Sequence, residues 1–136
     1  MASLRFVVPV VVIAALACTA GVRLQEFAPA HAPAGVAISL QLKSRRPEVH
    51  GELLALGDSA LFVLRDDGRI VAISYQVIDV AQCAQMAVVL YGGHPPQGST
   101  ARELRDVSRY PQGMSPDLLA RLLAAYGQSE VERMTP

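Results

Sequence analysis

A hairpin signal in the middle of the chain limits what this sequence can fold into. Residues 66–69 (Asp-Asp-Gly-Arg) separate two short apolar segments, residues 60–65 and 70–75. Glycine reaches the positive φ angles that tight hairpin loops require, and aspartate is common beside it. The two segments are therefore predicted to pair as antiparallel strands, which indicates a β-rich fold.

Further strand patterns lie on both sides of this hairpin. Residues 36–43 alternate apolar with small or polar side chains, the period of a half-buried strand. Residues 49–56 predict another strand, in which Gly51 would permit a bulge or bend. Residues 77–80 predict a short fifth strand, while the apolar run 85–91 fits either a strand or a helix. Short strands at this spacing are typical of a small barrel or sandwich.

The C-terminal part is predicted to be helical. Residues 115–117 (Ser-Pro-Asp) form a helix start, because serine caps, proline suits the first position and aspartate favours the dipole. Gly127 is predicted to end this helix. A shorter helix is expected from Ala101 toward Ser108, with residues 100–103 as its capping box. The longer helix carries an apolar stripe at helical spacing, formed by Leu118, Leu119, Leu122, Leu123 and Tyr126.

The apolar stripe has two interpretations. It packs against the β domain of the same chain, or it docks on a partner or on a second copy. On the second interpretation these five residues are the candidate partner-contact site.

Residues 49–80 resemble the small barrels of the SH3-like and Sm-like type. The resemblance rests on the strand 51–54 (Gly-Glu-Leu-Leu), the Asp67-Gly68 hairpin, and the segment 73–78 (Ile-Ser-Tyr-Gln-Val-Ile). It covers about a quarter of the chain, and it implies a short helical turn before the last strand. The expected fold is mainly β with a C-terminal helix: an SH3-like barrel or β-meander of about five strands closed by one or two helices. Barrels of this type are binding and assembly modules.

The N-terminus has the pattern of an export signal. Arg5 precedes an apolar run over residues 6–17, and residues 15–18 are Ala-Leu-Ala-Cys. The run is shorter than the roughly 20 residues that span a bilayer, which favours cleavage over an anchor. Residues 15–18 resemble a bacterial lipobox, which implies lipidation at Cys18, although alanine stands where leucine is preferred.

Other fates of the N-terminus stay open. The same residues satisfy an A-x-A site, so release of an unlipidated chain starting at Cys18 is the first alternative. Cys18 and Cys83 are the two cysteines, and an unlipidated Cys18 would permit a disulfide between them. An uncleaved single-span anchor is the third interpretation. Acylated, the chain would be held at the membrane, facing the periplasm or the outside of the cell.

The expected organisation is a signal peptide (1–17), a tether (18–35), a small β domain (36–91), a loop (92–99), a helical segment (100–127) and a polar tail (128–136). Removing residues 1–17 removes one of the 12 basic residues and none of the 12 acidic ones, which leaves a net charge of −1. This balance gives no basic surface for nucleic acid. The partners expected are therefore the membrane, through the lipid, and another envelope protein or a second copy.

One segment suggests an enzyme. Residues 54–59 (Leu-Ala-Leu-Gly-Asp-Ser) resemble the nucleophile block of the SGNH hydrolases, which would make Ser59 the nucleophile. The Asp-x-x-His that supplies the base in that family is missing downstream, and the residues after Ser59 predict a strand instead of a helix. The chain is also short for that fold. No other catalytic set is predicted.

The three histidines, His31, His50 and His94, lack the i,i+4 and H-x-H spacings of metal ligands, so neither a metal nor a cofactor is expected. The function expected is that of a non-enzymatic envelope lipoprotein that binds or assembles with an envelope or secretion-system protein. A secreted hydrolase using Ser59 is the alternative of another class.

Overall fold

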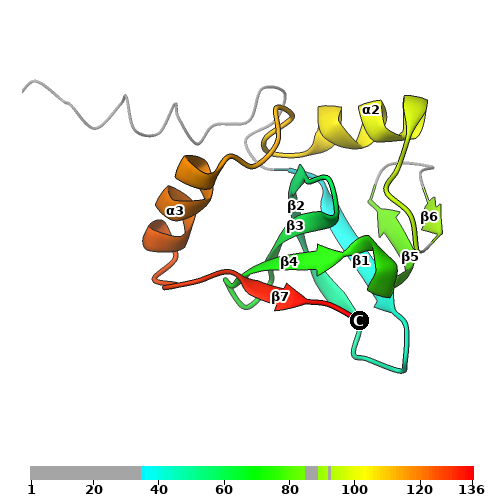
Figure 1. Ribbon diagram of the computed structural model, residues 1–136, viewed down its shortest axis with the longest axis horizontal. Coiled ribbons are helices and arrows are strands. Elements are labelled where there is room, and N and C mark those ends of the chain that lie inside the picture. The colour runs from blue at the N-terminus through cyan, green and yellow to red at the C-terminus, as the bar shows by residue number, and fades with distance from the viewer. Residues whose placement is uncertain (1–34, 85–88, 92) are drawn as a thin grey trace, which may run out of the picture.

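The computed structural model describes residues 35–84, 89–91 and 93–136 (Figure 1). The predicted signal peptide and lipidation site lie outside these residues. Among the described residues are two α-helices, α2 (Gly98–Val107) and α3 (Pro116–Ala125), and the short 3-10 helix η1 (Tyr75–Val77). The strands are β1 (Ala37–Leu42), β2 (Val49–Leu56), β3 (Ala60–Arg65), β4 (Ile70–Ser74), β5 (Ile78–Cys83), β6 (Val89–Tyr91) and β7 (Glu132–Met134).

The strands form one sheet in the order β6-β5-β1-β2-β3-β4-β7. Neighbouring strands are antiparallel except β4 and β7, which run parallel. The prediction of a mainly β fold is confirmed, and strands β1 to β4 form a consecutive meander. A closed barrel is not present: within the described residues the sheet is open, with β6 and β7 as its edges. These two edge strands bring the sheet from the expected five strands to seven.

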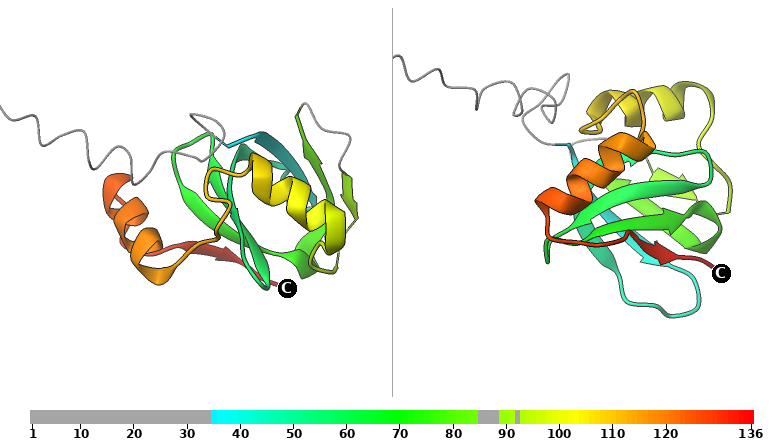
Figure 2. Two further views of the ribbon diagram at one scale, coloured as in Figure 1. Left: turned by 90° about the horizontal axis from the view of Figure 1, so that it is seen from above. Right: turned by 60° about the vertical axis from the view of Figure 1, so that its left-hand side comes forward.

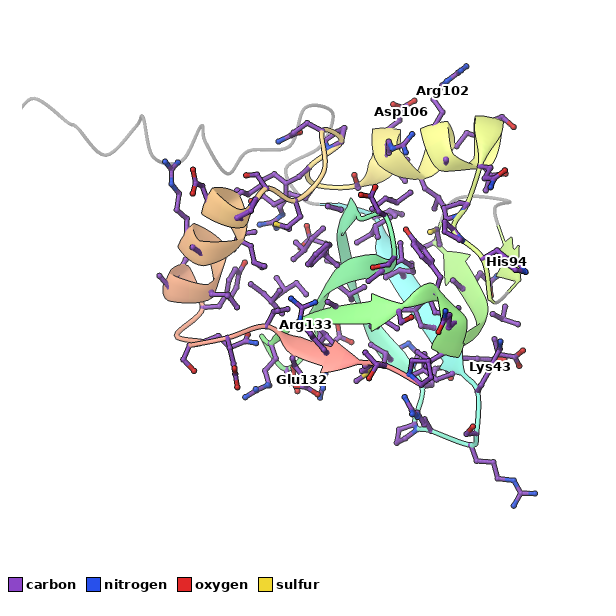
Figure 3. The ribbon with its side chains drawn as sticks, in the orientation of Figure 1. Lys43, His94, Arg102, Asp106, Glu132 and Arg133 are labelled. Atoms are coloured by element: carbon purple, nitrogen blue, oxygen red, sulfur yellow. The ribbon has the colours of Figure 1, made fainter. Side chains whose placement is uncertain are left out.

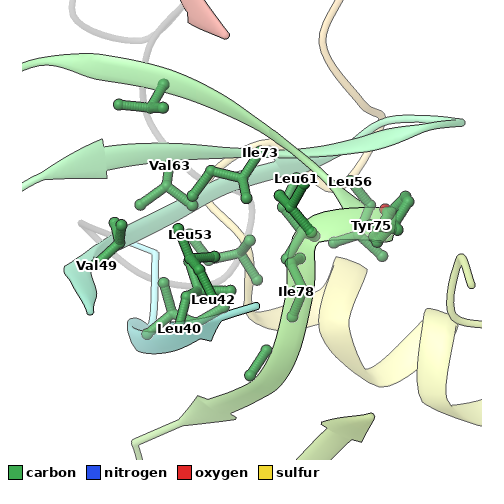
Figure 4. Close-up of a cluster of buried hydrophobic side chains, with 14 of the residues drawn as sticks. Leu40, Leu42, Val49, Leu53, Leu56, Leu61, Val63, Ile73, Tyr75 and Ile78 are labelled. Atoms are coloured by element: carbon green, nitrogen blue, oxygen red, sulfur yellow. The ribbon is translucent and has the colours of Figure 1, made fainter. Parts of the chain in front are cut away.

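The sheet buries apolar side chains on both faces, in two clusters that we call the inner and outer cores. Strand β3 shows the division, since Leu61 and Val63 belong to the inner core whereas Phe62 and Leu64 pack against the outer core. This alternation is the period-two geometry of a strand covered on both faces. The inner core (Figure 4) consists of Ile38, Leu40, Leu42, Val49, Leu53, Leu56, Leu61, Val63, Val71, Ile73, Tyr75, Val77, Ile78, Ala81, Cys83 and Leu104.

Strand β2 changes face within its own length. Leu53 and Leu56 point to the inner core, while the consecutive residues Leu54 and Ala55 both belong to the outer core. The β2–β3 register shifts between Leu53 and Ala55, which identifies a bulge or irregularity there. The predicted irregularity at Gly51 is therefore displaced toward the end of the strand. Glycine at that position serves close strand approach instead, because a Cβ atom would lie 2.2 Å from the carbonyl oxygen of Leu64.

The two helices lie at separate places around the sheet (Figure 2). Helix α2 contributes Leu104 to the inner core, and α3 covers the outer core with Leu122 and Leu123. Helix α3 starts at the predicted position, where the Ser115 hydroxyl accepts a hydrogen bond from the Leu118 amide at 3.2 Å. The start predicted for α2 was wrong: the helix begins at Gly98, and its N-cap residue makes no side-chain capping bond. The predicted capping box therefore lies inside the first turns of α2.

The C-terminal segment is part of the sheet, so the prediction of a loose tail over residues 128–136 was wrong. Residues 132–134 pair with residues 71–73 of β4. The Gln128 side-chain amide joins them by binding both backbone groups of Ile70, accepting from its N–H at 2.7 Å and donating to its carbonyl at 2.9 Å. A side chain thus extends the strand-like pairing by which the C-terminus covers the edge of β4.

A half-buried ion pair between Glu52 and Arg109 fixes the start of the described domain. The Glu52 carboxylate accepts hydrogen bonds from the Gly35 amide at 2.5 Å, and from Nε and Nη2 of Arg109 at 2.6 and 2.8 Å. Both side chains are about one-sixth exposed. Burial lowers the pKa of Arg109, and the hydrogen bond and charge of Glu52 raise it by more, so the net direction is upward. This pair joins the first described residue, strand β2 and the segment after α2.

Candidate functional site

A cleft of about 440 Å³ lies where three separate segments meet. Residues 46–50 come from the β1–β2 loop and the start of β2, and residues 65–67 come from the β3–β4 hairpin. Leu42 at the end of β1 and Met134 in β7 complete the lining. The volume falls in the range of ligand pockets, roughly 300–1,000 Å³.

The floor of the cleft is apolar. Leu42 and Val49 are buried members of the inner core, and Met134 packs partly buried against the same cluster. Pro47 adds an exposed apolar ring. Because the floor continues the inner core, a side chain lying in the cleft would extend existing apolar packing.

The basic groups of the rim bind acceptors of the protein itself. Arg65 donates through Nη2 to Asp67 at 2.5 Å and through Nη1 to Glu132 at 3.4 Å. Arg69, just outside the cleft, donates to the other oxygen of Glu132 at 3.1 Å. Arg46 donates to the carbonyl of Thr135 at 3.0 Å. These contacts hold the hairpin, the β1–β2 loop and β7 together, with Glu132 on β7 (Figure 3). Carboxylates compensate the charges of Arg65 and Arg69, whereas Arg46 donates to a neutral carbonyl.

Two acidic side chains of the rim are less engaged. Asp66 is exposed, and its carboxylate has no hydrogen bond or ion pair with another described residue. Glu48 is exposed, and its contact within the described part is His50 Nε2 at 3.8 Å, which is beyond hydrogen-bond distance. The charge still available at the rim is therefore negative.

His50 also faces Ser39 across the β1–β2 pair. The hydroxyl of Ser39 lies 3.0 Å from His50 Nδ1, and Glu48 lies on the other side of the ring. A serine, an imidazole and a carboxylate in a row is the order of a hydrolase triad. Glu48 and His50 are exposed and Ser39 is half-buried, and the carboxylate is too distant to orient the ring. The contact between Ser39 and His50 joins strands β1 and β2.

The β1–β2 loop adopts an unusual backbone conformation just before the lining residues 46–50. Ser44 and Arg45 have φ angles of 63° and 55°. The left-handed region costs non-glycine residues about 1–2 kcal/mol each. The loop is thus held in a shape that its local sequence does not favour.

The structure places the residues of the predicted partner-contact stripe mainly against the protein itself. Leu122 and Leu123 are buried in the outer core, and Leu118 and Leu119 pack partly buried against it. Tyr126 is 39% exposed. The stripe therefore contributes to the fold, and Tyr126 is its most accessible side chain.

The other candidate residues lie apart from the cleft. Cys18 is outside the described residues. Cys83 is buried in the inner core, and burial raises the pKa of its thiol to about 11. Ser59 is exposed in the turn between β2 and β3. Strand β3 begins directly after it, where the hydrolase block requires a helix.

Within the described ranges, no cluster of three or more His, Cys, Asp or Glu side chains is placed to hold a metal ion. In the same ranges, no helix has the length and apolar character needed to cross a membrane.

Sequence reasoning missed the cleft because its lining comes from positions 42, 46–50, 65–67 and 134, which are separated along the chain. The one local signal is the pair of aspartates in the 66–69 hairpin, whose pattern predicts a turn and no ligand site. Comparison with protein families, with curated proteins and with solved structures found no match.

Proposed function

We propose that this chain is an exported bacterial lipoprotein, acylated at Cys18, whose β domain is a non-enzymatic binding or assembly module for another envelope protein. The cleft carries the binding part of this proposal. It combines an apolar floor with a charged rim, and its lining includes no serine, threonine, cysteine or lysine side chain. An apolar floor with a few polar groups around it is the usual composition of a ligand-binding surface.

The strand order supports an assignment to the SH3-like or Sm-like type. Strands β5-β1-β2-β3-β4 are neighbours in that order, and η1 precedes β5 as the resemblance implies. On this proposal, β6 and β7 are additions that extend the two ends of the five-stranded unit. Fold type alone does not define the ligand, so the proposal rests on the cleft.

The anchoring part is tested by the intact mass of the protein isolated from the membranes of an exporting bacterial host. A mass that begins at Cys18 and includes acyl chains is expected. Cys18→Ser should lose the lipid and leave the membrane fraction. An uncut chain, or an unlipidated chain in the soluble extract, would overturn the anchored assignment.

The binding part is tested in the same cells with a photo-crosslinking residue at Pro47 in the cleft and, as the control, at Asp106 on α2. A discrete adduct with an envelope protein from position 47 alone is expected. Equal adducts from both positions would contradict a specific site. Hydrolysis of a nitrophenyl ester by the purified protein, lost in Ser59→Ala or Ser39→Ala, would instead make it an enzyme.

A further inference from the structure

We propose that the cleft binds an extended peptide segment of its partner in which a lysine or arginine follows an apolar residue. This inference rests on the proposed function, since it names the chemistry of the segment that the binding module receives. The argument uses the charge left available at the rim, the apolar floor and the shape of the β1–β2 loop.

The charge balance favours a cationic ligand. Among the lining residues, two arginines face three carboxylates, Glu48, Asp66 and Asp67, so the lining carries a formal charge of −1 with His50 neutral. The guanidinium of Arg65 is bound by Asp67 and Glu132, and Arg46 is held by Thr135. An incoming anion would have to compete with these contacts, whereas an incoming cation meets Asp66 and Glu48 without displacing a hydrogen bond of the described residues.

The floor selects the form of the cation. Lysine and arginine carry long aliphatic stems that bury well on apolar surface while the charged head stays at a polar rim. Leu42, Val49 and Met134 offer that surface beneath the two carboxylates. A bare metal ion would gain nothing from the floor, and the described residues hold no cluster suited to one. The neighbouring apolar residue of the peptide would occupy the rest of the floor.

The β1–β2 loop provides a preformed wall. Two consecutive left-handed residues, Ser44 and Arg45, precede the lining residues 46–48 of this loop and do not themselves line the cleft. Such backbone departures persist where the surrounding structure fixes them. The hydrogen bond from Arg46 to Thr135 holds the loop against the segment after β7. Little reordering of this wall would be needed when a segment binds.

The test uses the 15N-labelled protein isolated from membranes in an uncharged detergent. The probe is a blocked peptide, Gly-Ser-Leu-Lys-Ser-Gly, with two matched peptides that carry glutamate or norleucine in place of lysine. The lysine peptide is expected to shift the amide resonances of Leu42, Val49 and Asp66. The glutamate peptide is expected to leave them unchanged, and the norleucine peptide should bind more weakly than the lysine peptide.

Charge-neutralising variants test the rim. Asp66→Asn combined with Glu48→Gln should weaken the lysine peptide about two- to fivefold at low salt, the scale of exposed ion pairs. Asp106→Asn is the control, because Asp106 points away from the sheet on α2 (Figure 3). Unchanged amide spectra outside the substituted sites show that the variants are folded. Because both substitutions keep the side-chain size, a loss of binding reports the charge.

Several results would overturn this inference. They are resonance shifts away from the cleft, equal binding of the lysine and glutamate peptides, and affinity unchanged in the double variant. Shifts at the cleft that grow with protein concentration without peptide would make the occupant a second copy. If the lysine peptide does not bind but position 47 still crosslinks to an envelope protein, the proposed cationic peptide is refuted and the binding module is not. An unlipidated mass with intact lysine-peptide binding would refute only the anchoring.

Discussion

The ion pair between Glu52 and Arg109 should contribute strongly to the stability of the domain. Its carboxylate accepts three hydrogen bonds of 2.5 to 2.8 Å, one of them from the amide of Gly35. Removing one partner of a fully buried pair costs about 3–5 kcal/mol, because the remaining charge is left without compensation. Since both side chains are about one-sixth exposed, water offsets part of this penalty. We expect Glu52→Gln to lower the free energy of unfolding by about 2–3 kcal/mol.

A double-mutant cycle separates the pair from its surroundings. Arg109→Met keeps an unbranched stem and removes the donors, and it should cost about 2 kcal/mol by leaving Glu52 with the Gly35 amide. The double variant should be less destabilised than the sum of the single variants, with a coupling energy of about 1–2 kcal/mol. Urea unfolding followed by circular dichroism measures each value.

Glu103→Gln, on the exposed face of α2, is the matched control and should stay within about 0.5 kcal/mol of the parent. A Glu52→Gln variant as stable as this control would refute the reasoning. A coupling energy near zero would show that Glu52 acts through the Gly35 amide and not through the arginine.

Three further predictions concern packing, backbone and titration. Leu122→Ala should lower the free energy of unfolding by about 2–4 kcal/mol and Tyr126→Ala by less than about 1 kcal/mol, as measured by urea unfolding. The leucine fills the outer core, whereas the tyrosine is partly exposed. The reverse order would favour the interpretation of the stripe as a docking surface. Arg45→Gly should stabilise the domain by about 0.5–1 kcal/mol, since glycine adopts the left-handed conformation without strain, and a loss of stability would contradict a strained loop. Burial raises the pKa of Cys83 from 9.0 to about 11, so its thiol ionises at lower pH in the unfolded chain than in the folded one. The stability that comes from keeping this thiol neutral is complete below pH 9 and is lost as the pH rises toward 11. The free energy of unfolding, measured with urea from pH 8 to 11, should therefore fall less steeply in Cys83→Ala, and an identical slope would contradict the burial effect.

The features predicted from sequence are those with a local cause. The hairpin over residues 66–69 depends on a glycine, and Gly68 has the positive φ of 82° that the turn requires. The start of α3 depends on Ser115 and its two neighbours, which act within a single turn. In both places the residues that determine the structure are adjacent in the chain.

The features that were missed depend on distant residues. Strand β7 is three residues long, too short for a recognisable period, and it is held by Gln128 on Ile70 and by Glu132 on two arginines. The partners Glu52 and Arg109 are 57 residues apart. No local pattern of apolar residues reports such pairings, because they join polar side chains whose neighbours are known only once the sheet has formed.

The cleft follows from the way the protein covers the open end of its sheet. Strand β4 has a fully buried run from Ile70 to Ile73, and β7 covers its otherwise free edge. Glu132 and the carbonyl of Thr135 attach this cover to the β3–β4 hairpin and to the β1–β2 loop. The same contacts that protect the edge therefore bring the three lining segments together and occupy the basic side chains around them. Because the arginines are used to hold the cover in place, the carboxylates of Glu48 and Asp66 are left facing solvent above an apolar floor, and this asymmetry gives the cleft its preference for a cationic segment.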